Sequence, residues 1–194
     1  PRVEGIVVES TYNWYWLVDG LMEQGYKVHL ANTAAIQQYE GLKYTGDHSD
    51  ARWLAHLLRL GVLRQGYIYP RAERPVRDLL RKRSQLVRHR TTHVLSIQNL
   101  LTRNTGSSMK ANRVKGLDVQ QVDELLPDGD LALAVKANVA VMLSADEQVE
   151  LLEQTILQRV QLRPQFRFLK TVPGIGEILA LTIMLETGDI RRFA

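Results

Sequence analysis

The stretch Asp47-His48-Ser49-Asp50-Ala51-Arg52-Trp53-Leu54-Ala55-His56-Leu57-Leu58 determines how the first third of this 194-residue chain is organised. Its three leucines recur at helical spacing, which predicts a helix that begins near Asp47. Asp47 and Asp50 then lie three residues apart on one face of the first turn, where free amides and the helix dipole offset their repulsion. Such a pair is either a helix cap or part of a divalent-cation site, and spacing alone favours the cap.

A buried strand is predicted upstream, because residues 3–9 form a short β-branched apolar run that ends at Glu9. An acid at the carboxyl end of a core strand stands where α/β sheets place their sites, although it can equally point into water. A helix over 12–25, a second strand over 26–32 and a short helix over 33–39 follow. This order implies a parallel strand pair with a right-handed crossover, which is half of an RNase H-like sheet.

Two long helices are expected after an extended segment near Pro70. The first runs from about Glu73 to Arg103 and the second from about Asp130 to Arg163, and a capping-box pattern predicts an interruption near Ser144. Both carry apolar residues every seven positions, namely Leu80, Val87, Val94 and Leu101 in the first and Val135, Met142, Val149 and Ile156 in the second. The pattern is typical of an antiparallel coiled-coil arm, with a short helix at 119–126 in the connection.

Charge is divided unevenly along this arm. Residues 71–115 hold 12 Lys or Arg and 2 Asp or Glu, whereas residues 116–158 hold 1 and 9. Attraction between the two helices explains part of the pattern, but consecutive basic residues point around a helix and cannot all face one partner. The sequence therefore predicts phosphate contacts from Arg74, Arg77, Arg81, Lys82, Arg83, Arg88 and Arg90.

A Pro-Gly turn lies near the end of the chain, in the stretch 168–180. Gly174 and Gly176 allow backbone amides to approach a phosphate at the start of a following helix, which predicts a helix-hairpin-helix element. Glu177 at that position disfavours a phosphate, and a packing corner is the alternative interpretation.

Four motifs occur together in this order: Val7-Val8-Glu9-Ser10-Thr11, then Asp47-x-x-Asp50-Ala51, then Val172-Pro173-Gly174-Ile175-Gly176, and finally Gly188-Asp189-Ile190-Arg191-Arg192-Phe193. Together they resemble the transposases of the insertion-sequence 110 family. The resemblance implies a RuvC-like domain with a DEDD set of acids, a coiled coil, and a C-terminal domain with a nucleophilic serine. It also implies Mg²⁺ or Mn²⁺ as cofactor, DNA as substrate and, for some members, a bridge RNA guide.

Carried over to this chain, the resemblance assigns Glu9, Asp47 and Asp50 as catalytic metal ligands. The first aspartate and the serine of the family have no counterpart here, so we expect the chain to be an internal fragment. The expected domains are a partial RuvC-like domain (1–66), a coiled-coil arm (67–163) and the start of the serine domain with the helix-hairpin-helix-like motif (164–194). We expect a homo-oligomer formed through the coiled coil.

The chain has no cysteine and no apolar run of the roughly 18 residues that a membrane span needs, which fits a cytoplasmic protein without membrane contact. The predicted fold class is α/β with a long α-helical arm, and the predicted function is DNA transposition. Two alternatives stay open: a Holliday-junction resolvase-like nuclease, and a non-catalytic module for nucleic-acid binding and oligomerisation.

Overall fold

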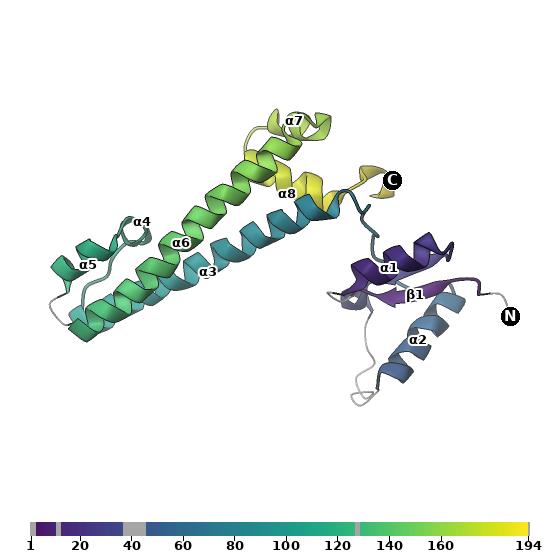
Figure 1. Cartoon of the computed structure of the whole chain (residues 1–194), viewed down its shortest axis with the longest axis horizontal. Coiled ribbons are helices and arrows are strands. Elements are labelled where there is room, and N and C mark those ends of the chain that lie inside the picture. The colour runs from purple at the N-terminus through teal and green to yellow at the C-terminus, as the bar shows by residue number, and fades with distance from the viewer. Residues whose placement is uncertain (1–2, 11–12, 37–45, 127–128, 194) are drawn as a thin grey trace. The chain divides into compact units, whose positions relative to one another are not determined.

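The computed structural model describes residues 3–10, 13–36, 46–126 and 129–193. The chain is mostly helical with one small parallel sheet, and it divides into two compact units, residues 1–71 and 72–194 (Figure 1). Within the described part, no helix is both long enough and apolar enough to cross a membrane.

The first unit is built on the parallel pair β1 (Ile6–Glu9) and β2 (Val28–Ala31), with Ile6 opposite Val28 and Glu9 opposite Ala31. Helix α1 (Trp14–Glu23) connects the two strands and packs on them, so that Val8, Trp14, Val18 and Leu30 form the core. The predicted parallel pairing is confirmed. β-Branched and aromatic side chains supply this core, as expected for a small sheet covered by a helix.

The predicted helix over 33–39 is wrong in its described part. The chain forms only one 3₁₀ turn, η1 (Thr33–Ala35), and Ile36 is already extended. Farther on, residues 64–66 run antiparallel to β2, since the Asn32 N–H donates to the Arg64 carbonyl at 2.9 Å and the Gly66 N–H to the Leu30 carbonyl at 2.7 Å. Helix α2 (Asp47–Arg59) precedes this segment and contacts β1.

The second unit is dominated by α3 (Arg74–Thr105) and α6 (Gly129–Val160), which pack along each other (Figure 1). Arg83 bonds to Glu153 and Arg90 to Asp146, so partner numbers fall along α6 as they rise along α3 and the pair is antiparallel. The predicted interruption near Ser144 is wrong, because Met142, Ala145 and Val149 all lie buried and packing keeps α6 continuous.

Two apolar clusters hold this unit together. At one end α4 (Ala111–Lys115) and α5 (Val119–Leu125) cover the helix pair, with Ile97, Val114, Val122, Val139 and Met142 at the centre. At the other end α7 (Pro164–Lys170) and α8 (Glu177–Thr187) do the same around Leu80, Ile156, Val160, Phe166 and Leu181, and η2 (Ile190–Phe193) follows. All four apolar residues that the seven-residue interval predicts for the α6 seam are buried, namely Val135, Met142, Val149 and Ile156.

Candidate metal site and nucleic-acid interface

Glu9 is the last residue of β1, and its side chain lies on the face of the sheet that α2 approaches. Strand residues alternate between faces, and Ile6 and Val8 pack in the core beneath α1. Gly5, Val7 and Glu9 therefore share the opposite face. A Cβ placed on Gly5 would lie 3.6 Å from Leu58 Cδ2 of α2, which identifies that face as the α2 side.

Asp47 and Asp50 occupy the first turn of α2, as the sequence predicts. The last turn of α2, through Leu58, lies beside the start of β1, and the helix runs back against the strand direction (Figure 1). The first turn of α2 therefore points toward the end of the sheet at which Glu9 stands. Asp47, Asp50 and Glu9 are all exposed.

The donor set suits a hard divalent cation, because it consists of carboxylates whose oxygens are not engaged in hydrogen bonds or ion pairs within the described segments. The three residues are not gathered into one centre. Across residues 3–10, 13–36, 46–126 and 129–193, no group of three or more acidic or histidine side chains lies close enough to hold a metal. The structure thus places Glu9 at the end of β1, and Asp47 and Asp50 at the end of α2 opposite to the turn that contacts the strand, without bringing the three carboxylates into contact.

Most of the predicted phosphate-binding arginines make intramolecular ion pairs. Arg77 and Arg81 both donate to Glu186 of α8, at 2.8 Å and 2.7 Å, while Arg83 donates to Glu153 at 2.7 Å and Arg90 to Asp146. Arg74 and Arg77 are buried. Of the predicted set, Arg81, Lys82 and Arg88 are exposed, and the Lys82 Nζ donates to the neighbouring Gln85 at 3.2 Å.

The Glu186 carboxylate joins α8 to α3, and its pKa lies below the ordinary glutamate value. The hydrogen bond from Arg81 is the largest cause, burial opposes it, and the positive charges of Arg77 and Arg81 add to the lowering. Because folding lowers this pKa, the stabilisation is fully present above the ordinary pKa of about 4.3 and is lost as the pH falls through the lowered value.

Replacing Glu186 with glutamine is expected to reduce the free energy of unfolding at pH 7 by about 1 kcal/mol or more, because buried Arg77 loses its charged acceptor. The difference from the unmodified chain should shrink as the pH falls below about 4. Urea unfolding between pH 3 and pH 7 measures it. Glu147→Gln, at an exposed position of α6, is the matched control and should change little at any pH.

Gly174 and Gly176 lie in the turn between α7 and α8. Gly174 has φ +85°, which favours glycine, and Gly176 is the N-cap of α8. A Cβ at either glycine would meet no atom within 4 Å, so this backbone is accessible. Glu177 in the first turn of α8 bonds to Lys170 Nζ at 3.1 Å, which partly neutralises the charge expected to disfavour a phosphate.

Two protein-family models match the chain. One, DEDD_Tnp_IS110, is described as a transposase and matches residues 3–105. The other is described as the transposase IS116/IS110/IS902 family and matches residues 166–194. No curated protein matches the chain.

Proposed function

Because this chain belongs to the IS110 family of transposases, which act on DNA, we propose that it forms part of an enzyme that cuts and rejoins DNA at a carboxylate metal site. Glu9, Asp47 and Asp50 would hold Mg²⁺ or Mn²⁺ and are the catalytic residues. The observation that supports this proposal is that α2, which carries Asp47 and Asp50 in its first turn, contacts β1, the strand that ends at Glu9.

In this proposal the three metal-binding carboxylates are held by two different elements, β1 and α2. Glu9 is fixed by the paired strand β1, whereas Asp47 and Asp50 are held three residues apart in one helical turn. Free amides at the start of α2 lower the cost of keeping both aspartates ionised. The bound metal would neutralise negative charge on the scissile phosphate. The first aspartate and the nucleophilic serine that the family resemblance implies have no counterpart among these 194 residues.

The proposal extends to the domains. Residues 1–66 would be part of a RuvC-like, RNase H-like domain, 67–163 a coiled-coil arm and 164–194 the start of the serine domain. The accessible turn at Gly174 and Gly176 supports a helix-hairpin-helix role in phosphate binding. DNA, and in guided members a bridge RNA, would contact the arm and the sheet unit in the cytoplasm.

The outer face of α6 supports the proposed homo-oligomer. Leu133 is 67% exposed and Leu151 is 55% exposed on the side that faces away from α3. Ala137, Ala140 and Ser144 lie between them, together with the exposed Glu147 and Gln148. Leu133 and Leu151 lie at equal sequence distances before and after Met142. A second copy running antiparallel would therefore place each leucine against its counterpart, as a two-fold interface requires.

Glutamate at both Leu133 and Leu151 is expected to convert the oligomer to a monomer, because four carboxylates would enter an apolar two-fold contact. Light scattering coupled to gel filtration measures the mass. The control is the double variant Leu125→Glu and Leu162→Glu, which changes exposed leucines elsewhere. An unmodified chain that is monomeric at every concentration would contradict the proposed interface.

The alternative function is a non-catalytic module for nucleic-acid binding and oligomerisation. It is favoured by the separation of the three carboxylates within the described part of the chain. A junction resolvase is less well supported, because the second transposase model matches the C-terminal segment. Metal-dependent cleavage by the whole protein encoded by the gene, compared with its Glu9, Asp47 and Asp50 variants, distinguishes catalysis from binding alone.

A further inference from the structure

Arg88 and Arg103 of α3 form no ion pair within the described residues, whereas other arginines of this helix do. Arg77, Arg81, Arg83 and Arg90 are committed to acidic partners. Arg88 and Arg103 are exposed, and their guanidinium groups make no hydrogen bond or ion pair with any residue that the structure describes. Ion pairing within the arm thus leaves Arg88 and Arg103 available to an external anion.

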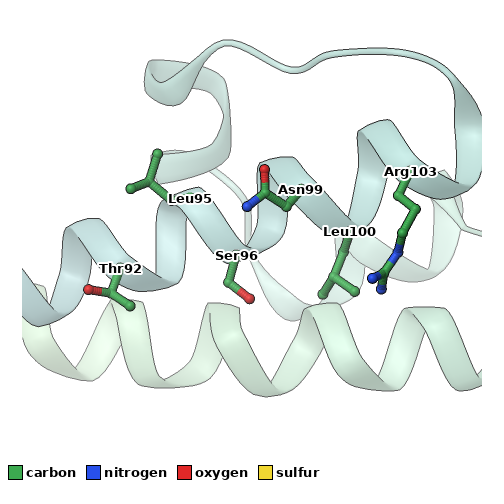
Figure 2. Close-up of a pocket in the computed structure, with 6 residues that line it drawn as sticks. All are labelled: Thr92, Leu95, Ser96, Asn99, Leu100 and Arg103. Carbon is green, nitrogen blue, oxygen red and sulfur yellow. The ribbon is translucent and has the colours of Figure 1, made fainter.

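Arg88 and Arg103 lie on the solvent-exposed side of α3. Val94, Ile97 and Leu101 are buried against α6, and positions 88, 92, 96, 99 and 103 follow one another at three- or four-residue steps along α3. A shallow groove of about 380 Å³ lies along α3. Its lining side chains are Thr92, Leu95, Ser96, Asn99, Leu100 and Arg103. Figure 2 shows Thr92, Ser96 and Leu100 directed toward the neighbouring helix α6, and Leu100 packs against the core that α6 shares.

The groove has the chemistry of a surface that binds a sugar–phosphate backbone. Hydroxyl, amide and guanidinium groups are the usual donors to phosphate oxygens. The last acidic residue of α3 is Asp78, so residues 79–105 add no repulsive carboxylate. Arg88 and Arg103 are 15 residues apart, which places them about 22 Å apart along the helix and allows contacts to separate phosphates.

The composition also indicates which kind of nucleic acid fits. Residues 70–165 contain no Phe, Trp or Tyr, and single strands are bound largely by stacking bases on such rings. A duplex keeps its bases paired and needs no stacking platform. Leu95, 53% exposed in the middle of the groove, offers an apolar contact that suits deoxyribose better than a sugar with a 2′-hydroxyl.

We propose that this exposed face of α3, formed by Arg88, Thr92, Leu95, Ser96, Asn99 and Arg103, binds the backbone of duplex DNA without reading its sequence. The proposal deepens the proposed function and rests on it, because it assigns the DNA of that reaction to one surface. Arg88 belongs to the basic residues predicted from the sequence. Thr92, Leu95, Ser96, Asn99 and Arg103 are added by the structure.

The test measures duplex DNA binding by the chain at several salt concentrations, in EDTA. Arg88→Gln with Arg103→Gln should weaken binding at least tenfold at low salt and reduce the slope of log K against log salt by about 2. Arg159→Gln with Arg167→Gln removes the same charge from exposed positions off this face and should change affinity less than threefold. Ser96→Ala with Asn99→Ala should weaken binding about fivefold without changing the slope.

Equal loss in the two arginine pairs would overturn the proposal, since only total charge would then matter. Tighter binding to single-stranded DNA or to duplex RNA than to duplex DNA would also overturn it. Because the assay contains no metal, it is independent of the carboxylates. Loss of cleavage with intact DNA binding therefore tests the roles of Glu9, Asp47 and Asp50. Unchanged binding by the Arg88 and Arg103 variant would overturn only the assignment of this face.

Discussion

Alanine at Asp47, Asp50 or Glu9 is expected to lower metal-dependent DNA cleavage by the whole protein by about 10²-fold or more. Each substitution removes a ligand from a site whose charge stabilises the reacting phosphate, and loss of one such group typically costs this much. All three side chains are exposed, so the loss should not arise from unfolding. Cleavage of labelled duplex DNA with and without Mg²⁺ measures the effect.

Glu4→Ala provides the matched control for this series. Glu4 is exposed and lies at the opposite end of the strand segment from Glu9, so it changes a nearby acid without touching the proposed site. It should retain nearly full activity. If cleavage persists in all three carboxylate variants, the carboxylates are structural and the binding module becomes the better description.

Alanine at Ile97 is expected to reduce the free energy of unfolding of the second unit by about 2 to 5 kcal/mol. Ile97 of α3 is fully buried in a core to which α4 and α6 also contribute. Its truncation leaves a cavity that the surrounding helices fill only in part. Chemical denaturation followed by far-ultraviolet circular dichroism measures the loss, because this unit is almost entirely helical.

Leu95→Ala makes a similar change two residues earlier on the same helix. Leu95 is exposed, so its truncation opens no cavity and should alter the free energy of unfolding by less than about 0.5 kcal/mol. Equal destabilisation by the two substitutions would contradict the burial of Ile97 in the core that α3 shares with α4 and α6.

Periodicity predicted the regular parts of this fold well. The parallel pair β1 and β2 follows from its short apolar runs, and the buried positions of α6 follow from the seven-residue interval. Local patterns were less successful where packing competes with them. Ser144 has the signature of a cap, but burial of its neighbour Ala145 keeps it inside a helix.

Charge patterns predicted less of the candidate interface, because they do not distinguish paired from free groups. Arg77 and Arg81 share an acid more than a hundred residues away, so no local signal indicates their pairing. Arg103 lies outside the dense basic run and received no role from the sequence, although it lines the exposed groove. Asp47 and Asp50 lie on one helical turn as predicted, whereas their relation to Glu9 depends on how α2 packs against the sheet.

Mn²⁺ titration of the isotope-labelled chain, followed by nuclear magnetic resonance, tests the proposed metal site most directly. A bound paramagnetic ion broadens the signals of nearby amides whether or not the protein is active. We expect the amides of Glu9, Asp47 and Asp50 to broaden together, those of Glu4 to broaden less, and the effect to disappear in the Asp47→Ala and Asp50→Ala double variant. Broadening that leaves Glu9 sharp, or that persists in the double variant, would contradict a shared site.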